Sequence, residues 1–97
     1  DINLDTFTLW TDVLQYLGEF ETAIDILLEA TNVLPNEYEI EYRLAGLYFT
    51  SGNNKKGSIH LINAMNLNLK QLSLFEELFP VIYERTEVQK TILKFKK

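Results

Sequence analysis

The residues that could do chemistry in this chain are few and far apart. His60 is the only histidine, and Ser58 lies two positions before it. Residues two apart on a helix point in different directions, so this pair does not supply the neighbouring serine and histidine of a catalytic triad. A metal site would need more histidines or clustered carboxylates at ligand spacing, and none converges on His60. We therefore expect His60 to be an exposed surface residue, and we expect no catalytic residue, no metal and no cofactor.

Acidic side chains recur along one helical segment, where they could pair for general acid–base chemistry. A solvated helix face with carboxylates near a positive N-terminus explains the same pattern more simply. The chain also lacks a glycine-rich loop with the Gly-Lys-Ser/Thr signature of phosphate binding. We therefore predict that the chain is not an enzyme. The acidic residues of this segment are Glu19, Glu21, Asp25 and Glu29.

Length and composition predict one domain, residues 1–97, with a small core. The chain has 97 residues, of which 46% are apolar, and no cysteine, so disulfides, thiolate metal sites and cysteine nucleophiles are excluded. The absence of cysteine fits a reducing cytosol, which makes the cytoplasm the favoured compartment. No apolar run approaches the ~18 residues that a membrane helix needs, so we expect no membrane span.

Charge is distributed unevenly along the chain. Residues 1–42 hold ten acidic side chains and no Lys or Arg, whereas residues 43–97 hold nine basic and four acidic side chains. The net charge of −5 argues against a general nucleic-acid binder, because such a protein needs a basic footprint. We therefore expect no nucleic-acid partner.

Similar residues recur 34 positions apart, which indicates an internal repeat. Within each unit the apolar residues follow helical spacing rather than strand alternation, so the predicted fold class is all-α. Gly18 and Gly52 stand where helices should end, a position that favours a left-handed backbone. The matched pairs are Gly18 and Gly52, Ala30 and Ala64, Leu27 and Leu61, and Leu14 and Tyr48. The predicted helices span about 4–17, 20–33, 38–51 and 55–67. The buried stripe of the first helix is expected at Phe7, Trp10, Leu14 and Leu17.

The last third of the chain departs from this pattern. The segment 72–79 is amphipathic, but Pro80 removes a backbone donor and clashes one turn back, so the helix should stop or kink there. Residues 86–89 have the form of a capping box, with Thr86 as N-cap and Gln89 reaching back to it. They open a last helix over about 87–95, whose buried face is expected at Val88, Ile92 and Phe95.

These positions resemble the tetratricopeptide repeat family, whose 34-residue units are pairs of antiparallel helices. The first unit matches at Phe7, Trp10, Leu14, Gly18, Phe20, Ala23, Leu27, Ala30 and Pro35, and the second at Leu44, Ala45, Tyr48, Gly52, Leu61 and Ala64. The departures are Thr11 and Gly57 at small-residue positions, Asn54 at an aromatic position and Leu69 at the proline position. The resemblance implies a right-handed α-α superhelix of about six helices. Repeat one would span about 4–37 and repeat two about 38–71, with a degenerate repeat and capping helix over about 72–97.

The resemblance also implies where a ligand would bind. In the second unit, Tyr42, Gly46 and Phe49 would line a concave groove, with Gly46 leaving an open floor between two aromatic walls. Thr8, Asp12 and Gln15 would continue the groove in the first unit, with Tyr16 and Arg43 at its edges. Because Arg43 is the only cation there, a carboxylate clamp is disfavoured. The alternative is that Tyr42 and Phe49 simply pack on the neighbouring unit.

The expected function is that of a non-catalytic scaffold module that binds a protein or peptide. A helix pair this short cannot bury its apolar face alone, so units must stack. The polar outer face of helix 87–95 would cap the array, whereas the N-terminal end has no cap, so we expect the C-terminal part of a longer array. The alternatives are a structural capping unit that self-associates through the uncapped N-terminal end, and a regulatory domain of a larger enzyme.

A substitution at a repeated alanine tests the 34-residue alignment. Ala30 and Ala64 should lie where two helices approach closely. Ala64→Leu should then overpack the contact and lower the free energy of unfolding by about 1–3 kcal/mol, measured by urea denaturation. A neutral or stabilising result would mean that the position faces solvent and that the alignment is shifted.

Overall fold

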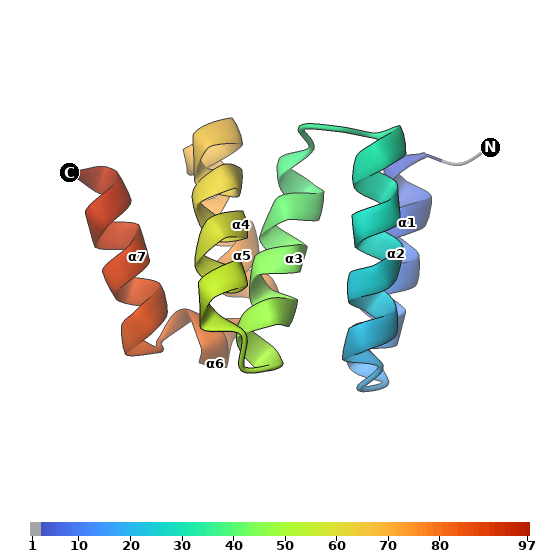
Figure 1. Cartoon of the computed structure of the whole chain (residues 1–97), viewed down its shortest axis with the longest axis horizontal. Helices are drawn as coiled ribbons and strands as arrows, with labels where there is room; N and C mark the ends of the chain where they lie inside the picture. Colours follow the sequence, from blue (N-terminus) through green and yellow to red (C-terminus); the bar gives the residue numbers. More distant parts are fainter. Residues whose placement is uncertain (1–2) are drawn as a thin grey trace.

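Residues with left-handed backbone separate the first four helices from one another (Figure 1). The computed structural model describes residues 3–97, so Asp1 and Ile2, the first residues of the expected domain 1–97, lie outside it. Gly18 and Gly52 have φ angles of 80° and 86° directly after helices, as expected, and Asn36 has a φ of 62°. The helices are α1 Leu4–Tyr16, α2 Phe20–Val33, α3 Tyr38–Thr50, α4 Asn54–Asn68, the short 3-10 helix η1 Leu69–Gln71, α5 Leu72–Leu78, α6 Pro80–Tyr83 and α7 Thr86–Lys96.

The predicted all-α class is confirmed, and residues 3–97 contain no strand. Each of the first four helices begins and ends within one residue of its predicted bounds. Side chains that the prediction did not use fix two of the starts. The Asn3 Oδ1 accepts a hydrogen bond of 3.0 Å from the Thr6 amide, and the Asn53 Oδ1 accepts one of 3.2 Å from the Lys56 amide. These are ordinary N-caps, which supply acceptors for amides at the start of a helix.

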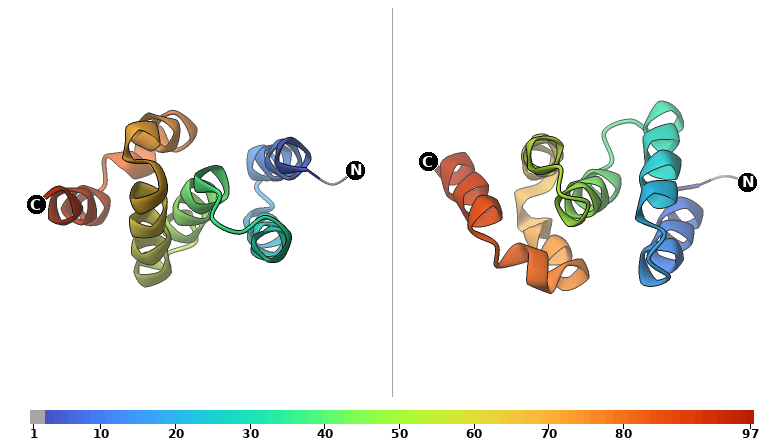
Figure 2. Two further views of the ribbon diagram at one scale, coloured as in Figure 1. Left: turned by 90° about the horizontal axis from the view of Figure 1, so that it is seen from above. Right: turned by 60° about the horizontal axis from the view of Figure 1, so that its bottom comes forward.

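The helices form a row of pairs about 40 Å long. In Figure 1, α1 and α2 stand at one end, α3 and α4 in the middle, and α7 at the other end. The second helix of the first pair packs on the first helix of the next, because α2 contacts α3. Farther along, α7 packs on α4, and the α5–α6 segment lies against α3 (Figure 2). No helix of residues 3–97 is long and apolar enough to cross a membrane.

Residues 34 positions apart occupy equivalent places in the core. Ala30 and Ala64 are both completely buried, and so are Leu27 and Leu61. Gly57 replaces an expected small residue and lies under the Phe49 ring, whose carbons would be 2.8–2.9 Å from an added Cβ. The absence of a side chain at position 57 therefore leaves the space that the Phe49 ring occupies.

The last third of the chain is irregular, as predicted from Pro80. Helix α5 ends at Leu78, and Pro80 is the first residue of α6, where its missing N–H costs no helical hydrogen bond. On α7, Val88 and Ile92 are buried and Phe95 packs partly buried against the core, which confirms the predicted face.

The predicted capping box at Thr86 is wrong. Thr86 is the first residue of α7, and the capping position belongs to Arg85, which makes no side-chain cap. The Gln89 Nε2 donates instead to the Tyr83 carbonyl at 2.6 Å, and the Arg85 Nη1 donates to the Phe49 carbonyl at 3.0 Å. Gln89, which was expected to reach back to the cap, therefore bonds to the preceding segment instead.

A close approach between segments joins α3 to the α5–α6 junction. Gly46, in the middle of α3, lies directly under the ring of Phe79, and an added Cβ would overlap that ring. Phe79 itself is only 5% exposed, so its ring has little room to move away. Glycine is therefore required at position 46 by space rather than by backbone conformation.

Substitution of this glycine should separate steric need from helix propensity. Alanine is favoured over glycine inside a helix by about 1 kcal/mol. Despite this, Gly46→Ala should lower the free energy of unfolding by about 1–2 kcal/mol, because displacing the Phe79 ring from its packed position costs more free energy than the helix propensity of alanine provides. Urea denaturation followed by circular dichroism measures the change.

A second variant identifies the cause. In the Phe79→Leu background, Gly46→Ala should cost much less than in the parent chain, because the smaller side chain leaves space for the methyl group. Equal costs in the two backgrounds would show that Phe79 is not what requires glycine at position 46.

Candidate functional site

The groove expected from the sequence is filled by the chain itself. Tyr42 and Phe49 are completely buried, and Phe79 covers the floor that Gly46 was expected to leave open. The Tyr42 ring packs on Phe75 of α5 at a centroid distance of 6.1 Å. The structure therefore contradicts the expected open groove at Tyr42, Gly46 and Phe49. The alternative, in which these aromatic residues pack on the neighbouring segment, matches the structure.

Tyr42 also fixes the end of α4. Its hydroxyl donates a 2.8 Å hydrogen bond to the Asn68 carbonyl, which lies at the end of that helix. Burial, and secondarily the nearby Tyr38, raises the pKa of the Tyr42 hydroxyl to about 12. The hydroxyl therefore remains protonated and acts as a structural donor, so it is not available to an external ligand.

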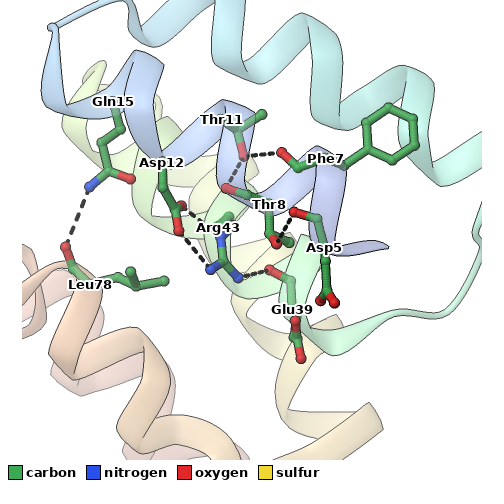
Figure 3. Close-up of polar contacts among 9 residues, drawn as sticks. All are labelled: Asp5, Phe7, Thr8, Thr11, Asp12, Gln15, Glu39, Arg43 and Leu78. Carbon is green, nitrogen blue, oxygen red and sulfur yellow. Dashed lines mark hydrogen bonds and ion pairs between the residues drawn. The ribbon is translucent and has the colours of Figure 1, made fainter. Parts of the chain in front are cut away.

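Asp12, expected to line the groove in the first unit, pairs with Arg43, expected at its edge (Figure 3). The Arg43 Nε is 2.8 Å from Asp12 Oδ1, and its Nη2 is 2.9 Å from Asp12 Oδ2. A third donor, Arg43 Nη1, reaches the Glu39 carbonyl at 3.0 Å. The Arg43 side chain is only 8% exposed, so it is not accessible to a ligand, and the Asp12 carboxylate is already paired with Arg43. The pair joins the first helix of one unit to the first helix of the next.

The other expected groove residues are divided between the interior and the surface. Thr8 is buried, and its hydroxyl donates to the Asp5 carbonyl at 3.2 Å. The Gln15 Nε2 donates to the Leu78 carbonyl at 3.4 Å and so links α1 to the end of α5 (Figure 3). Tyr16 is 89% exposed and stands apart from them. The structure therefore brings together Asp12 and Arg43, places Gln15 near them (Figure 3), and covers the expected groove at Tyr42, Gly46 and Phe49.

His60 does not have the exposed position expected for it. Its Nδ1 lies 2.8 Å from Glu41 Oε1, and its ring stacks on Tyr48 with centroids 5.4 Å apart. The side chain is 19% exposed. Within residues 3–97 no group of three or more His, Cys, Asp or Glu residues could hold a metal ion. His60 therefore fastens α4 to α3.

Several large apolar side chains are exposed on the outer side of α1. Trp10 and Leu17, expected in the buried stripe, are 53% and 63% exposed, so that expectation is wrong for both. Phe7 and Leu14 of the same stripe do pack against the core. We call the exposed set the α1 face, and its residues are Leu9, Trp10, Val13, Tyr16 and Leu17. Their spacing places them on one side of the helix, one and two turns apart.

The repeat itself shows what kind of element covers such a face. The residues 34 positions after Leu9, Trp10 and Val13 are Arg43, Leu44 and Leu47, and all are buried. The Arg43 contact with Asp12 shows that this side of α3 is turned towards the preceding helix pair. The α1 face thus corresponds to the side of α3 that the preceding helix pair covers. The sequence signal for it was available: α1 is apolar on two sides, and only one side packs inward.

No protein-family model, no curated protein and no solved structure matches the chain. The resemblance to tetratricopeptide repeats therefore depends on the quoted residues alone.

Removal of one charge tests the joint between the units. Asp12→Asn should lower the free energy of unfolding by about 1–2 kcal/mol, because it leaves the buried Arg43 guanidinium without its counter-charge. The value is below that of a fully buried pair, since the Asp12 side chain is 35% exposed. Glu29→Gln, which removes an exposed carboxylate from α2, is the control and should change stability by less than about 0.5 kcal/mol. Equal effects in urea denaturation would show that the ion pair does not stabilise the joint.

Proposed function

We propose that this chain is a non-catalytic protein-binding module of the tetratricopeptide repeat kind, and that it binds a helix of a partner protein on the α1 face. The observation that supports the proposal is the exposure of five large apolar side chains on one side of one helix, each 49–89% exposed. Isolated exposed apolar residues need no explanation, but a contiguous patch on a soluble protein usually marks an interaction site.

The chemistry of the patch suits protein recognition. Trp10 and Tyr16 are the residue types that most often dominate binding energy at interfaces, because they bury much area with few rotatable bonds. Leu9, Val13 and Leu17 surround them with aliphatic surface. Such a surface provides van der Waals contact and the hydrophobic effect, with no group placed for bond-making chemistry.

A helical partner is favoured by the way α3 is covered. At the equivalent positions of α3, an antiparallel helix pair occupies the surface, so the spacing of ridges on α1 already suits a helix. Charge gives the partner a second property. Because residues 1–42 are acidic and contain no Lys or Arg, a partner helix with basic flanks would associate faster than an acidic one.

The second copy of the chain is the competing occupant. An exposed apolar face on a terminal helix can pair with the same face of another molecule across a two-fold axis. This alternative predicts a dimer whose formation depends on Trp10 and Val13. Sedimentation equilibrium of the parent chain at rising concentration decides between the two: a monomer supports the partner proposal, and a dimer that Trp10→Ser abolishes overturns it.

The single tryptophan of the chain gives a direct binding assay. The probe is a synthetic peptide with the sequence of α2, residues 20–33, in which the outward acidic residues are replaced by lysine. It carries the apolar face that covers α3 in this protein, together with the basic charge expected of a partner. Binding should shift the Trp10 emission to shorter wavelength, because the indole leaves water.

Matched variants locate the contact. The double change Leu9→Ser with Val13→Ser should weaken probe affinity about tenfold or more, since it removes two apolar anchors from the face. Leu93→Ser, which removes an equally exposed leucine from α7, is the control and should leave affinity unchanged. If the probe leaves the emission of Trp10 unchanged, or if both variants weaken it alike, the α1 face is not the binding surface.

A further inference from the structure

A cleft of about 400 Å³ opens between α2 and the α3–α4 turn, away from the α1 face. Glu21 and Asp25 form one wall, one helical turn apart on α2. Tyr48 and Lys56 line the opposite side. Ile24 and Leu28, also on α2, add an apolar strip beside the two carboxylates. The cleft thus combines negative charge, an aromatic ring and aliphatic surface.

The acidic wall has no ion-pair or hydrogen-bonding partner among residues 3–97. Neither Glu21 nor Asp25 forms an ion pair or a side-chain hydrogen bond with any of residues 3–97, and both side chains are exposed. Lys56 lies in the same cleft without joining them. Its charge is directed instead at Tyr48, with the Nζ 5.5 Å from the centre of the ring. The ring of Tyr48 therefore already forms a cation–π contact with Lys56 of the same chain.

Tyr48 adds an unused hydrogen-bonding group. The residue is 8% exposed, yet its hydroxyl makes no hydrogen bond with any described residue. Because every fully buried polar side-chain atom among residues 3–97 has a partner, this hydroxyl is in contact with solvent, which it reaches through the cleft. Burial, and secondarily the Asp25 carboxylate, raises the pKa of this hydroxyl, and both residues line the same cleft. A nearly buried tyrosine thus presents a free oxygen beside two free carboxylates.

We propose that this cleft binds an arginine side chain of a partner protein, with the guanidinium between the Asp25 carboxylate and the Tyr48 hydroxyl and the aliphatic stem on Ile24 and Leu28. A guanidinium has five donors in a planar fork, so it can serve a carboxylate and a hydroxyl together. It is also less strongly hydrated than an ammonium group and stacks well on apolar and aromatic surface. Glu21 adds a second negative charge to the same wall.

Lys56 has a defined role in this arrangement. It is the resident cation of the cleft, and an incoming arginine must share the site with it or displace it. Neutralising Lys56 should therefore strengthen arginine binding, whereas neutralising Asp25 should weaken it. An adventitious acidic surface would respond only to total charge and would not distinguish Lys56 from the adjacent Lys55, which does not line the cleft.

The test is a titration with blocked tripeptides, followed by the amide chemical shifts of the labelled protein. The probe is acetyl-Gly-Arg-Gly-amide, and its matched competitors carry lysine or the neutral isostere citrulline in place of arginine. The expected result is a set of shifts confined to residues around Glu21–Leu28 and Tyr48–Lys56, with the lysine peptide weaker and the citrulline peptide weakest.

Four variants assign the contacts. Asp25→Asn should weaken the arginine peptide about fivefold, and Tyr48→Phe, which keeps the ring, should weaken it about twofold. Lys56→Gln should strengthen it about twofold, and Glu29→Gln, a carboxylate of the same helix outside the cleft, should change it least. Circular dichroism of each variant verifies the fold.

Three results would overturn the proposal. The first is a shift pattern that does not centre on the cleft. The second is equal binding of the arginine, lysine and citrulline peptides. The third is an Asp25→Asn effect no larger than that of Glu29→Gln. None of these results bears on the α1 face, because no residue of α1 lines the cleft.

Discussion

Each helix pair in this protein depends on a neighbour to cover the apolar side that its own two helices leave open. The middle helix shows the constraint most fully. Nine of the thirteen residues of α3 are buried, because α2, α4 and the α5–α6 segment all pack on it. Within residues 3–97, the helices at the ends of the row pack on a neighbour on one side only. At the C-terminal end α7 presents lysines to solvent, whereas α1 presents tryptophan, leucine and valine.

The joint between the first two units combines this apolar packing with one charged contact. Arg43 is the first basic residue of the chain, and it lies under an acidic unit. Because a bidentate guanidinium tolerates little displacement, the Asp12–Arg43 pair fixes the relative position of α1 and α3 more sharply than apolar contact does. A shift of one helical turn between the units would leave both charges without a partner.

The sequence allowed the helices to be predicted closely because their signals are local. Glycine after a helix, helical spacing of apolar residues and the 34-residue period all act within a single unit. The groove prediction failed because a glycine at position 46 is compatible with two arrangements. It could leave an open floor for a ligand, or it could leave space for an aromatic ring of the same chain, and only the tertiary structure distinguishes the two. The capping box failed for a related reason, since Gln89 is used by the Tyr83 carbonyl. The cleft beside Tyr48 could not be predicted, because its walls come from helices that the sequence alone does not place together.

The row of pairs also determines where the protein opens first. A helix pair that is packed on one side only breaks fewer interactions when it opens than α3 and α4 do. Amide hydrogen exchange should therefore be slowest in the middle of the row and faster towards α1. Most neighbouring helices are also neighbours in sequence, which favours rapid folding that spreads outward from the centre. A partner helix on α1 would close the end at which fraying begins. Association at that end and local folding of the first helix pair would then form a single coupled equilibrium.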